Sequence, residues 1–156
     1  MIAATHQYRA ALRAAEASAR GYRLTGNAAQ RQEFDANRRL VEHELQAVAR
    51  LTADRPTQAA RVRELRELTA HRLRLSQAMI DGPRGNRAAA RLIAEGVQTT
   101  ARIEASASAI LATERRLLAD RRERGAMHAR WLVAFLRRRL RLRRGPARAA
   151  DAQPAT

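Results

Sequence analysis

The stretch from residue 87 to residue 124 constrains the fold most, because no proline or turn sequence interrupts it before Gly125. Along it, residues that can pack recur in alternating steps of three and four. The series is Ile93, Gly96, Thr100, Ile103, Ala107, Ile110, Glu114, Leu117 and Arg121. This alternation is a heptad pattern, whose members share one face of a helix. The stretch therefore predicts one long helix with a continuous packing face, in which Glu114 is a polar insertion.

Three shorter helices are predicted before that stretch, over about residues 3–22, 28–51 and 57–80, because turn signals separate them. The turn signals are Thr25-Gly26-Asn27, Asp54-Arg55-Pro56 and Asp81-Gly82-Pro83-Arg84-Gly85-Asn86. Asp54 is expected to cap the third helix, and Pro56 is expected in its first turn. Each predicted helix has one apolar stripe. The stripe of the first is Tyr8, Leu12, Ala15, Ala19 and Tyr22, and that of the second is Phe34, Val41, Leu45 and Val48. The stripe of the third is Val62, Leu65, Leu68 or Thr69, and Met79. Short connections imply antiparallel neighbours, so we predict an all-α fold, an up-and-down four-helix bundle with a long C-terminal helix.

Composition excludes several kinds of active site. The chain has 156 residues, which suits one compact domain, and it contains no cysteine. All 31 cationic side chains are arginines. Schiff-base lysines, thiol nucleophiles, thiolate metal sites and disulfides are therefore excluded. Aromatic residues make up 3% of the chain, which disfavours a β-sandwich or barrel.

The four histidines do not form a recognisable metal or catalytic motif. They are His6, His43, His71 and His128, and none has a second histidine or a Glu-x-x-His carboxylate at ligand spacing. No Gly-x-Ser-x-Gly sequence is present either. We therefore predict no catalytic residues, no metal, no cofactor and no enzymatic activity.

Two acidic residues are candidates for ion pairs inside the bundle. Glu16 and Arg20 have the i,i+4 spacing of a favourable helical pair, beside the predicted bend at Gly26. At that bend the Arg20 guanidinium could also bind carbonyl groups left free by the interrupted helix. Glu114 lies on a packing face and needs a cation, which either Arg20 or Arg61 could supply.

The composition changes beyond Gly125, so we divide the chain into three parts: a helical bundle over 1–124, an apolar and arginine-rich helix over 125–144, and a disordered tail over 145–156. The formal net charge of the whole chain is +16.

Candidate contacts to a membrane or an anion are Trp131, Arg137, Arg138, Arg139, Arg141, Arg143 and Arg144. No apolar run reaches the ~20 residues of a transmembrane helix, and residues 1–21 lack the apolar core of a signal peptide.

Three blocks of sequence resemble one family. Glu16, Arg20-Gly21-Tyr22 and Leu24-Thr25-Gly26 match its Glu-x-x-x-Arg-Gly-Tyr-x-Leu-Thr-Gly motif. Residues 51–61 are similar to its Leu-Thr-x-Asp-Asn-Pro-x-Gln-x-x-Arg segment, with Arg55 in place of the usual Asn, and residues 114–121 are similar to its Glu-x-x-Leu-Leu-x-x-Arg ending. The family is the CHASE domain, class three (cyclases/histidine kinases associated sensory extracellular), and the resemblance covers about residues 8–123.

The resemblance implies a sensory module of bacterial membrane receptors, placed outside the cytoplasmic membrane between two transmembrane helices. Such modules act on histidine kinases, cyclases or chemoreceptors inside the cell, and no ligand is generally assigned to them. The matching positions, which we expect to be structural, are Glu16, Arg20, Gly21, Tyr22, Thr25, Gly26, Asp54, Pro56, Gln58, Glu114, Leu117 and Leu118. We expect a homodimer through the fourth helix, a small-molecule or protein signal, and a position next to the membrane.

The end of the sequence departs from the family pattern. An apolar run, residues 131–136, resembles the start of a second transmembrane helix but stops at Arg137-Arg138-Arg139. Arginines at that depth are costly in a membrane. We favour a fragment of a receptor that lacks its transmembrane and output domains. The alternative is a stand-alone basic adaptor that binds a membrane surface, an acidic partner or nucleic acid through these arginines. Nucleic acid is disfavoured because the arginines of the bundle alternate with acidic residues.

Overall fold

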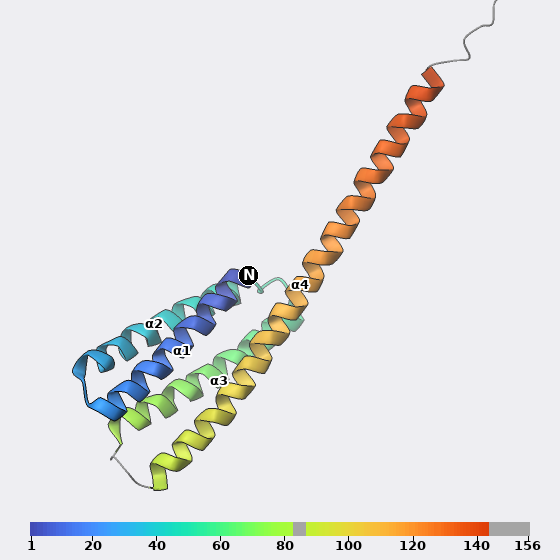
Figure 1. Cartoon of the computed structure of the whole chain (residues 1–156). Coiled ribbons are helices and arrows are strands. Elements are labelled where there is room, and N and C mark those ends of the chain that lie inside the picture. Colours follow the sequence, from blue (N-terminus) through green and yellow to red (C-terminus); the bar gives the residue numbers. More distant parts are fainter. Residues whose placement is uncertain (83–86, 144–156) are drawn as a thin grey trace, which may run out of the picture. The chain divides into compact units, whose positions relative to one another are not determined.

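The described part of the chain forms four helices. The computed structural model describes residues 1–82 and 87–143, except for the side chains of residues 88, 129, 133, 134 and 136–143. The helices are α1 (Ile2–Thr25), α2 (Ala28–Arg50), α3 (Pro56–Asp81) and α4 (Arg87–Arg143) (Figure 1). The described residues contain no strand, and the predicted all-α bundle with a long last helix is confirmed.

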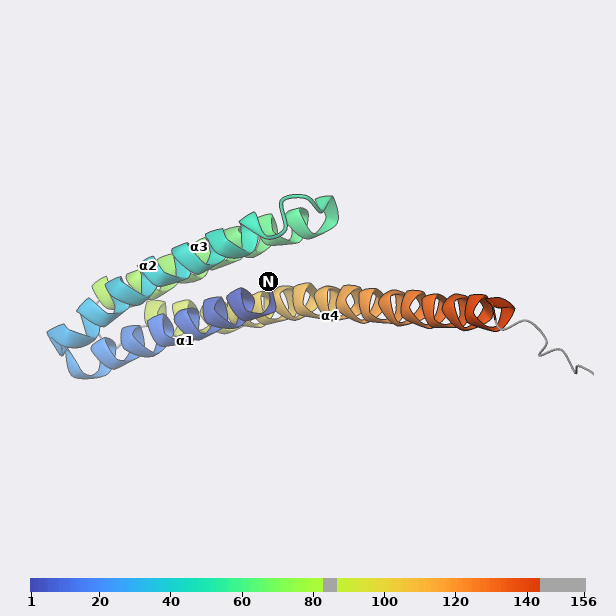
Figure 2. The ribbon, with the colours of Figure 1, turned by 90° about the horizontal axis from the view of Figure 1, so that it is seen from above.

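Two compact units divide the chain, residues 1–115 and residues 116–156, and each is described by itself. The first unit holds α1, α2, α3 and the first part of α4, which lie side by side as an up-and-down bundle (Figures 1 and 2). An ion pair between Arg9 and Glu104 joins α4 to α1, and a hydrogen bond between His71 and Glu95 joins α4 to α3.

The turn between α1 and α2 is fixed by local hydrogen bonds. Gly26 has the left-handed conformation, with φ at 71°, and its N–H donates to the Tyr22 carbonyl over 2.7 Å. Asn27 caps α2 by accepting a hydrogen bond from the backbone N–H of Ala29 over 2.9 Å. A left-handed glycine followed by an asparagine cap ends one helix and begins the next. The predicted turn at this position is confirmed.

The start of α3 differs in part from the prediction. Pro56 is in its first turn as expected, but Arg55 is the N-cap residue and makes no side-chain capping bond. The predicted capping by Asp54 is wrong. The Asp54 carboxylate is 78% exposed and pairs with the Arg55 guanidinium over 3.9 Å. The backbone turn before α3 places Asp54 one residue too early to cap it.

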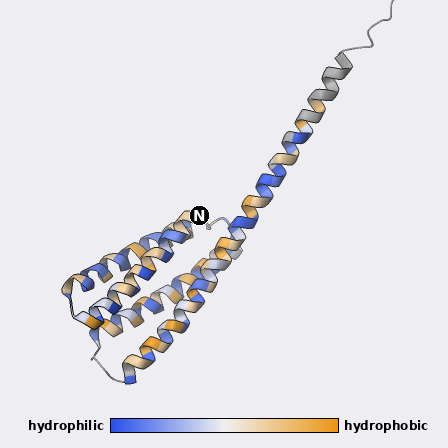
Figure 3. Cartoon of the chain, in the orientation of Figure 1, coloured by the Kyte–Doolittle hydropathy of each residue, from blue (hydrophilic) through white to orange (hydrophobic). Residues whose placement is uncertain are grey.

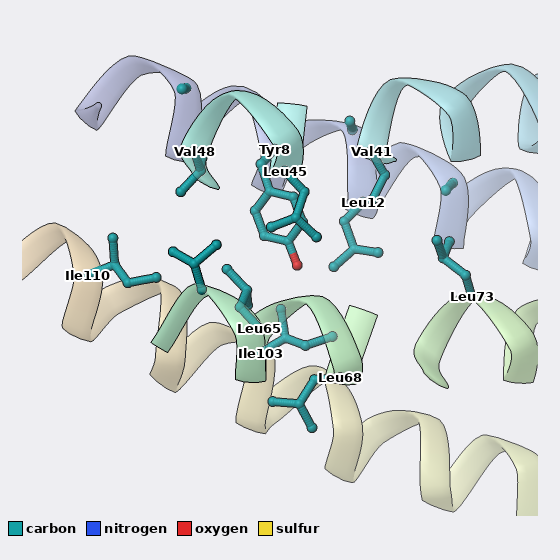
Figure 4. Close-up of a cluster of buried hydrophobic side chains, with 14 of the residues drawn as sticks. Tyr8, Leu12, Val41, Leu45, Val48, Leu65, Leu68, Leu73, Ile103 and Ile110 are labelled. Carbon is teal, nitrogen blue, oxygen red and sulfur yellow. The ribbon is translucent and has the colours of Figure 1, made fainter. Parts of the chain in front are cut away.

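The core of the bundle lies between the apolar stripes of the four helices (Figure 4). Its labelled members are Tyr8, Leu12, Val41, Leu45, Val48, Leu65, Leu68, Leu73, Ile103 and Ile110. Colouring by hydropathy shows apolar and polar residues alternating along each of these helices (Figure 3). Burial of one face of each helix is therefore the main stabilising contribution.

Ile93 is an exception to the predicted packing face of α4. Its side chain is 56% exposed, whereas Ile103, Ala107 and Ile110 further along the same face are buried. The reason is that Ile93 borders an open cavity at this end of the bundle, described below.

The second unit contains the rest of α4, and the helix continues through Gly125. A glycine with no competing turn conformation weakens a helix without ending it. Apolar side chains are exposed here: Met127, Trp131, Leu132 and Phe135 are 61%, 75%, 65% and 51% exposed. No helix of the described residues is long and apolar enough to span a membrane. Arg144 and the tail of residues 145–156 lie outside the described residues, as do the side chains of Arg137, Arg138, Arg139, Arg141 and Arg143.

Candidate functional site

A buried ion pair joins α1 and α3. The Nε atom of Arg72 lies 2.8 Å from Oε1 of Glu16, and each side chain is 9% exposed. Buried charges are strongly destabilising unless they are paired and hydrogen-bonded. This pair therefore fixes how α1 and α3 face each other.

Hydrogen bonds extend the ion pair to α4. The Thr100 hydroxyl donates to Oε1 of Glu16 over 2.8 Å and accepts from Nε of Arg72 over 2.9 Å. Nη1 of Arg72 donates to the Ser76 hydroxyl over 2.8 Å. We call Glu16, Arg72, Ser76 and Thr100 the polar cluster. It links three helices, so a displacement of any one of them changes the contacts of the other two.

The polar cluster lies against α4 at Gly96. A Cβ atom at this position would lie 3.4 Å from Cζ of Arg72 and 3.5 Å from its Nη1. The guanidinium group therefore packs against α4 at Gly96, at a distance where a Cβ atom would make ordinary van der Waals contact with it. Gly96 and Thr100 are both members of the heptad series found in the sequence.

The predicted pair between Glu16 and Arg20 is wrong. Glu16 turns into the bundle toward Arg72, whereas Arg20 is exposed and makes no hydrogen bond or ion pair with the other described residues. The spacing within α1 could suggest Arg20 as the partner of Glu16. A partner on α3, such as Arg72, leaves no signal in the sequence around Glu16.

A cavity of about 410 Å³ lies beside the polar cluster, between α1, α3 and α4. Glu16, Arg72 and Thr100 contribute to its lining, together with Arg20 and Arg23. The remaining lining residues are small or apolar: Leu24, Met79, Ala89, Leu92, Ile93, Gly96 and Val97. Clefts of this size with apolar walls and a few polar groups are the usual form of small-molecule sites.

Arg23 has the role that was predicted for Arg20. Its Nη1 donates to the carbonyl oxygens of Met79 over 3.0 Å and Gly82 over 2.6 Å. Arg23 thus binds the carbonyl groups at the end of α3 rather than those of its own helix. Nearby, hydrogen bonds from Gln77 and from Arg31 hold the pKa of Asp81 below its ordinary value.

A second buried carboxylate lies toward the other end of the bundle. Glu114 accepts a hydrogen bond from Nη1 of Arg55 over 2.6 Å, and its side chain is 10% exposed. The prediction that Arg20 or Arg61 would pair with Glu114 is wrong, since Arg61 donates to the Thr113 hydroxyl instead. Arg55 is the residue that replaces the usual Asn of the resembled motif. The antiparallel arrangement of α3 and α4 brings the start of α3 beside Glu114.

Comparison with known proteins identifies the family. The model of the CHASE3 domain family matches residues 1–124. The chain belongs to the CHASE3 family. It is also similar to the crystal structure of the sensor domain of histidine kinase HK9 from Rhodopseudomonas palustris, with 31% identity and a TM-score of 0.70, covering 76% of this chain and 96% of that one. No curated protein sequence shows significant similarity to it. This CHASE3 domain is an extracytoplasmic sensory domain of the kind found in signal-transduction receptors.

The signature positions Gly21, Tyr22 and Thr25 of the CHASE3 domain make contacts within α1 and with the start of α2. At Gly21 a Cβ would lie 1.7 Å from Oε1 of Gln30, so the side-chain amide of Gln30 occupies the space beside this glycine. The Arg31 guanidinium lies over the Tyr22 ring, 5.8 Å from its centre. The Thr25 hydroxyl donates to the Gly21 carbonyl over 2.8 Å.

The later signature positions connect α3 with α4. Nε2 of Gln58 donates to the Ile110 carbonyl over 3.4 Å, one turn before Glu114. Leu117 and Leu118, which belong to the second unit, are partly buried. That the signature positions are structural remains a prediction.

The chemistry available in the cavity suits binding. Among the side chains that the structure describes, no group of histidine, aspartate and glutamate could hold a metal ion. The polar lining consists of guanidinium groups, one carboxylate and one hydroxyl, which recognise charge and hydrogen-bonding groups.

Proposed function

We propose that this CHASE3 domain is the signal-input domain of a homodimeric bacterial receptor, that it lies at the outer side of the cytoplasmic membrane, and that α4 carries the signal. The observation that supports this most strongly is the continuity of α4. The same helix contributes Gly96 and Thr100 to the cavity and the polar cluster, and continues to Arg143.

A continuous helix is a suitable element for transmitting a small displacement. Packed helices switch between discrete arrangements by shifts of about 1–2 Å or by rotation. A signal that changes the contacts of the polar cluster would displace the part of α4 that carries Gly96 and Thr100, and the same helix continues to Arg143.

Dimerisation through α4 is supported by the continued heptad series. Extending the steps of three and four beyond Arg121 gives positions 124, 128, 131 and 135. Trp131 and Phe135 are exposed apolar residues on this series. Exposed apolar side chains in a row mark a surface that contacts another molecule. A second copy of α4 would bury them in a coiled coil.

Disulfide cross-linking tests the dimer directly, because the chain contains no cysteine. Leu117→Cys and Arg124→Cys place a thiol on the heptad series, whereas the matched variants Ala119→Cys and Ala126→Cys place it on the opposite face. We expect the first two to cross-link several times faster under mild oxidation. Equal rates at all four positions, with a monomer in sedimentation at high concentration, would exclude this dimer.

A further inference from the structure

We infer that the cavity between α1, α3 and α4 binds a small organic anion, a carboxylate that carries a short apolar body. This inference rests on the proposed input function and names the class of ligand that would act there. It is carried by the combination of charge, apolar surface and size found in this one cavity.

The lining carries an excess of positive charge. Three guanidinium groups, from Arg20, Arg23 and Arg72, face a single carboxylate, that of Glu16. Glu16 is already engaged by Arg72 and Thr100. Because the carboxylate of Glu16 is occupied, the described lining has no anion left to balance Arg20. A ligand carboxylate would supply the missing negative charge.

Arginine is suited to this recognition. A guanidinium group presents paired N–H donors that match the two oxygens of a carboxylate. The ion pair of Arg72 with Glu16 and its hydrogen bonds to Thr100 and Ser76 use its Nε and Nη1 atoms. Arg20 is exposed and forms no bond with any other described residue, so its donors can turn toward a ligand at low cost.

The rest of the cavity lining is largely apolar, and part of it is open to solvent. Leu24, Ile93 and Val97 are 83%, 56% and 65% exposed, although they lie in the unit that buries most of its other large apolar side chains. Met79 and Leu92 complete this wall. Exposed apolar residues gathered beside arginines favour an amphipathic ligand over a bare inorganic anion. The volume of about 410 Å³ limits the apolar body to the size of a short chain or one ring.

Binding can be measured by calorimetry on the full chain with hexanoate and phenylacetate as probes. Hexanamide and phenylacetamide test the charge, because they keep the shape and lose the carboxylate. Acetate tests the apolar body, because it keeps only the carboxylate. We expect saturable binding of the two carboxylates and at least about tenfold weaker binding of the amides and of acetate.

Two substitutions assign the binding to this cavity. Arg20→Gln is expected to weaken the binding of phenylacetate by about tenfold or more, whereas Arg39→Gln, an exposed arginine on α2, is expected to leave it within about twofold. Val97→Trp fills the cavity and is expected to abolish binding, with Leu40→Trp on α2 as its control. All four positions are exposed, so the variants are expected to fold.

Several results would overturn the proposal. These are the absence of saturable carboxylate binding, equal binding of the amides, or an Arg20→Gln variant that binds normally. A dimer that dissociates on the Val97→Trp substitution would assign the cavity to a second copy of the chain instead. If the cysteines at positions 117 and 124 still cross-link while no probe binds, the ligand class fails and the α4 dimer stands. If the probes bind but the cysteines do not cross-link, the ligand class stands and the α4 dimer fails.

Discussion

Tyr8 shows how a single polar group is accommodated in this core. Its side chain is fully buried, and its hydroxyl lies 2.6 Å from Oγ1 of Thr69, across the space between α1 and α3. Burial raises the pKa of the Tyr8 phenol to about 12. The hydrogen bond with Thr69 opposes this rise, and the charges of Glu104 and Glu16 add to it. The native state therefore requires Tyr8 to be neutral.

The fold is predicted to lose stability between about pH 10 and pH 12. Because the pKa of Tyr8 is higher in the folded than in the unfolded chain, its contribution is complete below pH 10.0 and is lost as the pH rises toward 12. The chain has no lysine or cysteine whose titration would overlap this pH range. Urea unfolding across this range measures the effect.

The Tyr8→Phe variant is the control for this prediction. It removes the ionisable group and also the hydrogen bond to Thr69, which costs about 1 kcal/mol at neutral pH. Above pH 10.0, the unfolding free energy of Tyr8→Phe should fall less steeply than that of the natural chain. Parallel curves for the two proteins would show that Tyr8 does not control the alkaline transition.

Local chemistry determines where the helices begin and end, and this is why their bounds could be predicted. The signals at Gly26 and Asn27 act within one turn of the backbone, so the sequence alone contains them. The apolar stripes likewise follow from periodicity within each helix. The partner of Glu16 could not be predicted, because Arg72 lies on another helix and nothing in its neighbourhood distinguishes it from the other arginines of α3. The cavity could not be predicted either, because its lining residues come from three different helices.

The turn between α1 and α2 offers a test at the level of elements. Gly26→Ala is expected to destabilise the bundle by about 1 kcal/mol, because an L-residue with φ at 71° is strained. Gly125→Ala is the matched control. That glycine lies within α4, where a Cβ would meet nothing within 4 Å. Alanine there should preserve or raise helicity, since it is the better helix former.

Thermal unfolding followed by circular dichroism distinguishes the two glycines. A lower midpoint for Gly26→Ala and an unchanged or higher midpoint for Gly125→Ala would agree with the structure. If both variants unfolded at the same temperature as the natural chain, the left-handed turn would not be needed for the stability of the bundle.

At the scale of the whole molecule, charge opposes compactness. The chain carries a formal net charge of +16, from 31 arginines and 15 acidic residues. Ion pairs between helices offset part of the repulsion, notably those of Glu16, Glu104 and Glu114. Several exposed arginines, including Arg39, Arg66 and Arg74, add positive charge to α2 and α3.

Moderate salt is therefore predicted to stabilise the bundle. Raising the ionic strength from about 0.01 M to about 0.15 M shortens the screening length from about 30 Å to about 8 Å. This weakens the repulsion among exposed arginines, whereas the buried pair of Glu16 and Arg72 is screened much less. The midpoint of urea unfolding should rise, and the rise should be smaller in the triple variant Arg39→Gln, Arg66→Gln, Arg74→Gln. A midpoint that falls with salt would mean that exposed ion pairs outweigh the net repulsion, and that the excess of arginine does not limit stability.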